Sequence, residues 1–316
     1  MPEVRSGRRP IVVGTAALDV LHSGPLGRGV PPVTLRWGGV AHNVACALAA
    51  CDAAPILITA DYLGELRSAL AGHLVEAGVD WFPLGGRTPL PLFHGELVDG
   101  SVARMHFLGD EALRLLTPRL LSGCGQLFDQ ASVVVATTDC DRATMDWLAG
   151  AAAERGRDFW VVSTDPNEVG KLRGERPPAS LVSLNLQELS LWAECPLAEP
   201  AEICRAARRI AAPNGRCLVT QGADGAMLVP ARDEQLLIQP APRIRRREVI
   251  VGAGDVLIGC LLASRLAGTN WPAALREASE LTGAYLEATG DADQPYHSLR
   301  RAWLSDRVTQ NPSKIA

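Results

Sequence analysis

The stretch VIVGAGDVLIGCLLASR, residues 249–265, passes from a β-branched run through a Gly-Ala-Gly turn into an apolar segment. Because the segment after the turn is apolar on every side, it predicts a buried helix. Gly252 and Gly254 let the backbone turn tightly and approach a ligand closely. The unpaired N–H groups and the positive end of the dipole at a helix N-terminus attract anions, so we expect an anion-binding turn here.

Asp255 follows this turn directly and falls in the first turn of the predicted helix. A carboxylate beside an anion-binding turn suits phosphoryl transfer, because it can take a proton from a hydroxyl while the turn holds the phosphoryl group under attack. An ordinary helix start after a glycine turn explains the same residues, since short glycine motifs also occur without a function. Burial of the helix favours the catalytic interpretation, because it would hold the N-terminus rigidly in a cleft.

Length and composition limit the class of protein. With 316 residues, of which 47% are hydrophobic, the chain can build one large α/β domain, and we predict a single domain over residues 1–316. A net charge of −4 argues against a nucleic-acid partner. The eight cysteines form no CxxC pair, and no apolar stretch reaches the roughly 18 residues of a membrane span. These features predict a cytoplasmic protein with reduced cysteines and no membrane partner.

The first eighty residues alternate between strand and helix patterns, at residues 11–14, 40–51, 55–60, 63–77 and 79–83. This order predicts a mostly parallel sheet flanked by helices. After the first strand we expect a loop that carries Asp19 at the carboxyl edge of the sheet, where ligands bind. The helix at 40–51 is expected to be amphipathic, with Asn43 in its first turn and His42 facing solvent.

Two runs at residues 91–98 and 101–108, joined at Asp99-Gly100, carry a hairpin signal. Together with a strand at 33–37, they are expected to form a small antiparallel sheet over the cleft. Such a lid, inserted at about residues 30–38 and 90–108, would exclude water from a transferable phosphoryl group. Because exposed strand edges pair with copies of themselves, we expect a homodimer through the lid.

Polar residues follow two strands in the second half of the chain. Asn185 ends a strand at 181–184, and Glu188 lies on the same face of the helix start that follows. The two form either a ligand-holding pair or a plain capping box. Thr220 ends the next strand and precedes a loop with Gly222 and Gly225, which either holds phosphate oxygens or is only a tight turn.

Five segments thus stand in one order along the chain: Asp19, GGVAHN at 38–43, NLQE at 185–188, TQGADG at 220–225 and GAGD at 252–255. This order resembles the ribokinase-like (PfkB) family of carbohydrate and nucleoside kinases over roughly residues 11–295. The resemblance implies a central, mostly parallel sheet flanked by helices, with a small β-sheet lid. Within the family, GGVAHNVA, residues 109–121 and DPNEVGK at 165–171 are similar to segments of the pseudouridine kinases.

The resemblance implies roles at the reacting centre. Asp255 would be the base that activates the 5′-hydroxyl of the substrate, and the turn before it would be the anion hole for the transferring phosphoryl group. The implied residues are Gly252, Ala253 and Gly254 for the anion hole, and Asp19, Gly38, Gly39, Asn43 and Lys171 for the substrate.

The resemblance also implies ATP as phosphoryl donor and Mg²⁺ as its partner. The nucleotide would be bound by Asn185, Glu188, Thr220, Gly222 and Gly225, with Glu188 acting on Mg²⁺ indirectly, through water. Val249 and Val251 stand where the family commonly has Asp and Thr, which leaves a monovalent-cation site near this turn open. Ala17 likewise replaces a frequent Asn, so the ribose or base pocket is expected to differ.

The leading hypothesis is an ATP- and Mg²⁺-dependent kinase that makes pseudouridine 5′-phosphate. A PfkB-family kinase for another nucleoside or for a free sugar, such as ribose or fructose, is the alternative. The losses at Val249 and Val251 motivate a hypothesis of another class, a non-catalytic sensor that binds a nucleoside or nucleotide. A dinucleotide-binding oxidoreductase is disfavoured, because GTAALD at 14–19 stands where GxGxxG is required.

Overall fold

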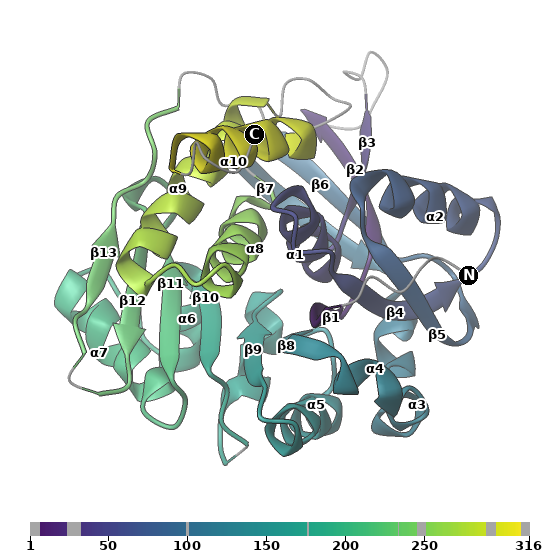
Figure 1. Cartoon of the computed structure of the whole chain (residues 1–316), viewed down its shortest axis with the longest axis horizontal. Helices are drawn as coiled ribbons and strands as arrows, with labels where there is room; N and C mark the ends of the chain where they lie inside the picture. Colours follow the sequence, from purple (N-terminus) through teal and green to yellow (C-terminus); the bar gives the residue numbers. More distant parts are fainter. Residues whose placement is uncertain are drawn as a thin grey trace.

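The computed structural model describes residues 7–23, 33–98, 101–175, 177–232, 234–244, 251–288 and 295–310 (Figure 1). Within these residues the largest element is a nine-stranded sheet of order β13-β12-β11-β10-β9-β8-β1-β4-β5. The pairs from β11 to β5 are parallel, whereas β12 and β13 are antiparallel to their neighbours. The strands are Arg9–Val13 (β1), Ile56–Tyr62 (β4), Asp80–Thr88 (β5), Ala131–Thr137 (β8), Asp158–Val162 (β9), Leu181–Asn185 (β10), Arg216–Thr220 (β11), Ala226–Pro230 (β12) and Leu237–Gln239 (β13).

Helices cover both faces of this sheet (Figure 1). Successive strand residues point to opposite faces, so Val12 belongs to one apolar cluster while Ile11 and Val13 belong to the other. The first cluster is covered by Val40–Ala50 (α1), Glu65–Ala77 (α2), Ala253–Leu266 (α8), Trp271–Ala288 (α9) and Pro295–Gln310 (α10). The second is covered by Pro118–Ser122 (α3), Gly125–Asp129 (α4), Arg142–Glu154 (α5), Leu186–Ala193 (α6) and Pro200–Ala211 (α7).

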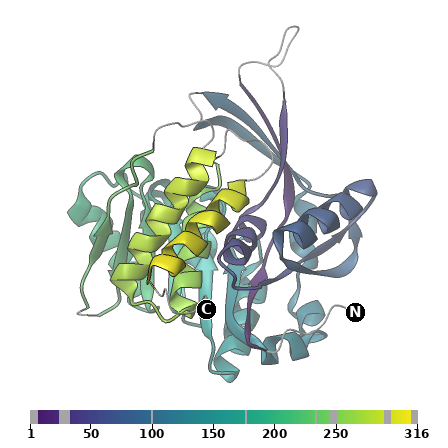
Figure 2. The same ribbon diagram turned by 45° about the horizontal axis from the view of Figure 1, so that its top comes forward.

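A separate small sheet has the order β3-β2-β6-β7 and stands at one end of the molecule (Figure 2). It consists of Thr34–Gly38 (β3), Ala17–Ser23 (β2), Leu92–Val98 (β6) and Ser101–Leu108 (β7). The antiparallel pairing of the two predicted runs at 91–98 and 101–108 is confirmed, and the turn predicted at Asp99-Gly100 lies outside the described residues. The sheet is not wholly antiparallel, because β2 pairs with β6 in parallel. Asp19 therefore lies in a strand rather than on the predicted loop. The alternating burial of Ala17–Ser23 shows why this segment forms a strand.

The prediction that α1 is amphipathic, with His42 in solvent, is wrong. Every residue of α1 after Val40 is buried, and His42 has no exposed surface. The helix packs against α8 on one side, and a Cβ added at Gly259 of α8 would lie 2.5 Å from the Cβ of Ala47. The small residues of α1 and this glycine thus allow two buried helices to approach closely. The strand expected before α8 lies mostly outside the described residues, and Val251 is in a turn.

Candidate active site

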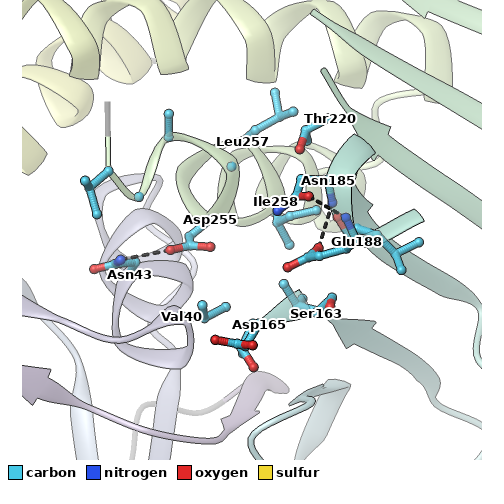
Figure 3. Close-up of a pocket in the computed structure, with 18 of the residues that line it drawn as sticks. Val40, Asn43, Ser163, Asp165, Asn185, Glu188, Thr220, Asp255, Leu257 and Ile258 are labelled. Carbon is cyan, nitrogen blue, oxygen red and sulfur yellow. Dashed lines mark hydrogen bonds between the residues drawn. The ribbon is translucent and has the colours of Figure 1, made fainter. Parts of the chain in front are cut away.

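The carboxyl ends of the parallel strands, the N-termini of α1 and α8 and the small sheet enclose a cavity of about 990 Å³ (Figure 3). Phe93, Met105 and Phe107 line it from the small sheet. The predicted site residues that line it are Asp19, Gly39, Asn43, Asn185, Glu188, Thr220, Gly222, Gly225, Gly252, Ala253, Gly254 and Asp255.

The N-terminus of α8 opens into this cavity. Gly252 adopts a left-handed conformation, with φ of 86°, and no side chain caps the helix. Its carbonyl accepts the first helical hydrogen bond, from the N–H of Val256 at 3.0 Å, so the N–H groups of residues 253–255 have no partner within the helix. A Cβ at Gly252 would lie 3.1 Å from Nδ2 of Asn43. Both the backbone angle and the available space therefore favour glycine in this turn.

Asp255 is partly buried at the inner edge of this N-terminus. Its carboxylate accepts a hydrogen bond of 2.9 Å from Nδ2 of Asn43, at the start of α1 (Figure 3). Burial raises the pKa of Asp255 to about 7; the hydrogen bond from Asn43 opposes this rise, and the negative charges of Glu188 and others reinforce it. A carboxylate with a pKa near neutrality is a suitable general base, because it both takes up and releases a proton near pH 7.

Asp19 faces the cavity from β2, opposite Arg36 of β3. Arg36 Nε lies 3.5 Å from the Asp19 carboxylate, and its Nη2 donates to the carbonyl of Val251 at 2.9 Å. Burial raises the pKa of Asp19 to about 6, although Arg36 opposes the rise. Gly38 does not line the cavity, but a Cβ there would overlap the Asp19 carboxylate. Arg36, which sequence reasoning missed, thus links the small sheet to the turn before α8.

On the opposite wall, β10 ends at Asn185, which caps α6. Oδ1 of Asn185 accepts from the N–H of Glu188 and Oε2 of Glu188 accepts from the N–H of Asn185, both at 2.8 Å. The structure therefore confirms the capping box, while both residues also line the cavity. Burial raises the pKa of Glu188 to about 7, and the hydrogen bond from the Asn185 backbone opposes the rise. The cap orients a carboxylate that remains accessible from the cavity.

The loop after β11 lies beside the N-terminus of α8. Gly225 has φ of 94°, and a Cβ there would lie 2.6 Å from the backbone nitrogen of Ala241, so only glycine fits without a shift. A Cβ added at Gly254 would lie 4.0 Å from Oγ1 of Thr220. The structure thus brings the two predicted phosphate-binding turns, 27 or more residues apart in the sequence, to one end of the cavity.

Two further carboxylates, Asp139 and Asp165, line the cavity and were not predicted as site residues. Asp139 accepts from Oγ1 of Thr137 at 3.1 Å, and burial raises its pKa. Its position two residues after the end of the buried strand β8 is the signal that could have identified it. Lys171 lies outside the cavity lining, where Nζ donates to the carbonyls of Thr138 and Cys140 at 2.7 and 3.1 Å and pairs with Glu168. It therefore holds the loop that carries Asp139.

Comparison with known proteins agrees with this geometry. The model of the pfkB family carbohydrate kinases matches residues 20–297, and the chain belongs to this family. It is 30% identical to the bifunctional protein HldE of Azotobacter vinelandii, over 94% of this chain and 64% of that protein. The chain spans less than two thirds of the length of such curated relatives.

Solved structures show the same fold. The ribokinase of Giardia lamblia has a TM-score of 0.77 at 15% identity, covering 96% of this chain and 99% of that one. The ribokinase of Arabidopsis thaliana, complexed with ribose and ATP, has a TM-score of 0.73 at 15% identity, covering 95% and 98%. The predicted family and the ribokinase-like α/β fold are therefore confirmed. Within the described residues, no helix has the length and apolar character needed to cross a bilayer.

Proposed function

We propose that this chain is a kinase that transfers a phosphoryl group from ATP to a hydroxyl of a nucleoside or sugar. The observation that carries the proposal is Asp255, a partly buried carboxylate with a raised pKa in the first turn of a helix whose N-terminus opens into the cavity. Phosphoryl transfer depends on placing the hydroxyl in line with the phosphoryl group and on neutralising the charge that develops. The N-terminus of α8 supports both requirements at one point.

In this proposal, Asp255 accepts the proton of the acceptor hydroxyl as its oxygen attacks the phosphoryl group. Asn43 holds the carboxylate through its amide and limits the rise of the Asp255 pKa. The N–H groups of Ala253 and Gly254 face the developing negative charge, as an oxyanion hole does. The small sheet closes the cavity and reduces the access of water to the reacting groups.

The nucleotide end of the cavity fits ATP and Mg²⁺ by its donor set. Thr220 and the backbone of the loop 220–225 offer hydrogen-bond donors for phosphate oxygens. Asp139, Asp165 and Glu188 offer the carboxylate oxygens that Mg²⁺ prefers. We propose that Glu188 acts on the ion through water, because one of its oxygens is engaged in the cap of α6. Bound there, Mg²⁺ would neutralise phosphate charge.

The proposed acceptor is the 5′-hydroxyl of pseudouridine. Asp19, Gly39 and Asn43 would hold ribose hydroxyls, and the aromatic side chains of Phe93 and Phe107 offer an apolar surface for a base. The similarity of the segments GGVAHNVA and DPNEVGK to those of pseudouridine kinases supports this choice. A free sugar, such as ribose or fructose, is the second candidate, because the family model is that of carbohydrate kinases.

The test measures ADP release from ATP and Mg²⁺ with pseudouridine, uridine, cytidine, adenosine, ribose and fructose, each with the wild-type chain and with Asp255→Asn. Turnover that is confined to pseudouridine and lost in the variant would support the full proposal. Turnover on a sugar would retain the mechanism and replace the acceptor. Ligand binding without turnover on any acceptor would favour the sensor hypothesis.

We also propose a homodimer that forms through the small sheet. Among the described residues of this sheet that do not line the cavity, some apolar side chains have large exposed fractions, such as Leu35 at 61% and Val98 at 52%. Such surface is uncommon on a monomer when it is contiguous. Light scattering after size exclusion tests this: a dimer that Leu35→Glu dissociates is expected, and a monomeric wild-type mass would refute it.

A further inference from the structure

Behind the Asn43–Asp255 contact, three side chains with metal-binding atoms converge. His42 and Cys46 lie on α1, and His73 lies on α2. His42 Nε2 is 3.0 Å from His73 Nε2 and 3.4 Å from Cys46 Sγ, and the three ligand atoms lie within 4.8 Å of one another. The proposed reaction uses none of these atoms. We propose that His42, Cys46 and His73 form a binding site for Zn²⁺.

The spacing of the ligand atoms suits a tetrahedral ion. With Zn–N bonds of about 2.05 Å and Zn–S bonds of about 2.3 Å, tetrahedral angles place two nitrogens about 3.4 Å apart and a nitrogen and a sulfur about 3.6 Å apart. The observed separations of 3.0 and 3.4 Å are shorter by a few tenths of an ångström. Small side-chain rotations would move the ligand atoms apart by this amount. His42 and Cys46 are four residues apart on one helix, so both point to the same side.

Asn43 determines which nitrogen of His42 carries a lone pair. Nδ2 of Asn43 donates to Asp255, so its Oδ1 is the acceptor, and His42 Nδ1 lies 3.0 Å from that oxygen. Nδ1 therefore bears the proton, and Nε2 presents its lone pair toward His73 and Cys46. Metal-binding histidines commonly donate their other ring N–H to a carbonyl or carboxylate oxygen, which fixes the tautomer and the ring orientation.

The charge states of the cluster also suit a cation. Burial lowers the pKa of His42 to about 3 and lowers that of His73, so both rings are neutral at pH 7, as ligands must be. Burial raises the pKa of Cys46, whose thiol would lose its proton to solvent as the Zn–S bond forms. Among the described residues, the cluster provides three ligand atoms, one from each side chain, which leaves the fourth position of a tetrahedral ion open. A water molecule would complete the tetrahedron and reach the ion beside His73, which is partly exposed.

Zn²⁺ bound at this site would have a structural role. The ion would link α2 to the first turn of α1, and His42 is hydrogen-bonded to Asn43, which in turn holds Asp255. His42 is therefore a positioning residue, two hydrogen bonds away from the carboxylate. The metal site itself does not depend on the proposed function, because its test measures binding rather than turnover.

In the experiment, the purified chain is treated with a chelator, the chelator is removed, and Zn²⁺ or Co²⁺ is titrated in. Excess Mg²⁺ is present so that the carboxylates of the cavity do not compete for the added ion. We expect one Zn²⁺ per chain by elemental analysis and a thiolate-to-cobalt charge-transfer band. Cys46→Ala should abolish the band, and His73→Ala should weaken Zn²⁺ binding by at least about tenfold. Because His73 is partly exposed, its variant is expected to fold even if Cys46→Ala does not.

Two control variants are matched to these changes. Cys260→Ala removes a buried thiol that lies 3.9 Å from Cys51 Sγ and outside the cluster, and it should leave the cobalt band unchanged. His94→Ala removes one member of another close histidine pair, with His22 at 3.0 Å, and should leave Zn²⁺ affinity unchanged. Absence of stoichiometric binding in the wild type, or binding that persists unchanged in the His73 variant, would overturn the proposal.

Discussion

The two walls of the cavity hold their polar side chains in different ways. On the wall formed by β10 and α6, Asn185 and Glu188 bond to each other across three residues of one helix start. On the wall formed by α1 and α8, Asn43 bonds to Asp255 across 212 residues of sequence. The first arrangement forms whenever α6 begins correctly. The second exists only while α1 and α8 are packed together, so changes to helix packing should affect the two walls unequally.

The largest expected effect is that of Asp255→Asn. Loss of the general base should lower kcat for the best acceptor by about 10²–10⁴-fold, with little change in the KM for that acceptor, because the variant keeps the size of the side chain. Steady-state ADP release measures this. Asp129→Asn, which changes an exposed carboxylate paired with Arg155 at 2.8 Å, should retain wild-type turnover. A loss below tenfold in Asp255→Asn would rule out the proposed role.

Asp255→Asn also tests how much the desolvated carboxylate lowers the stability of the folded chain. The pKa of Asp255 rises from 3.8 to about 7 on folding, so the folded chain binds this proton more tightly than the unfolded chain. The contribution to stability is complete below pH 4 and is lost as the pH rises through about 7. Asp255→Asn should therefore raise the Tm at pH 8 and leave it nearly unchanged at pH 4, where the carboxyl is protonated in both states. An equal change at both values would contradict the raised pKa.

On the wall formed by β10 and α6, substitutions of Glu188 test whether its role in capping α6 can be separated from its proposed role in Mg²⁺ binding. Glu188→Gln keeps an oxygen for the capping box but removes the charge, so the Mg²⁺ requirement should rise by about 10–100-fold, while the Tm at pH 4, where this carboxyl is protonated, stays nearly constant. Glu188→Ala removes both and should also lower stability by about 0.5–1.5 kcal/mol. Activity is measured against Mg²⁺ concentration at pH 8, where Glu188, whose pKa is about 7, is ionised.

For the wall formed by α1 and α8, the matched test is a substitution that disturbs the packing of α8 on α1. A Cβ at Gly259 would lie 2.5 Å from Ala47 Cβ and 2.9 Å from the Val44 carbonyl oxygen, so Gly259→Ala should lower the free energy of unfolding by about 1–3 kcal/mol. Gly150→Ala on α5, where nothing lies within 4 Å, should be neutral or stabilising by up to about 1 kcal/mol. Urea denaturation measures both, and equal effects would contradict the packing argument.

The smallest expected effect is a shift in pH dependence. Because Asp255 must be ionised to accept a proton, kcat/KM should rise with pH and reach half its maximum near pH 7. Asn43 opposes the rise of this pKa, so Asn43→Ala should move the midpoint upward by up to about one pH unit. Tyr296→Phe, which removes a hydroxyl that lies 3.3 Å from Oδ1 of Asn43 and leaves the hydrogen bond from Nδ2 of Asn43 to Asp255 in place, should leave the midpoint nearly unchanged. A downward shift in Asn43→Ala would refute the assignment.

Several parts of the fold and site could be predicted from the sequence because their physics is local. The antiparallel pair at 91–98 and 101–108, the capping box at Asn185 and Glu188, and the glycine turn before Asp255 each depend on neighbouring residues or on short periodic patterns. The order of these segments along the chain was enough to indicate the family, which the match over residues 20–297 confirms.

Other features were decided only by tertiary structure. Asp19 was expected on a loop, but it lies in β2 opposite Arg36, because strands distant in sequence complete the small sheet. His42 was expected in solvent, but α2, α8 and α10 pack on α1 and His42 is buried, next to His73 of α2. A periodic pattern shows which faces of a segment are apolar but not which segments will cover them. Which segments cover one another depends on contacts between residues far apart in the chain. Such contacts bring Asn43 to Asp255 and bring His73 to His42 and Cys46.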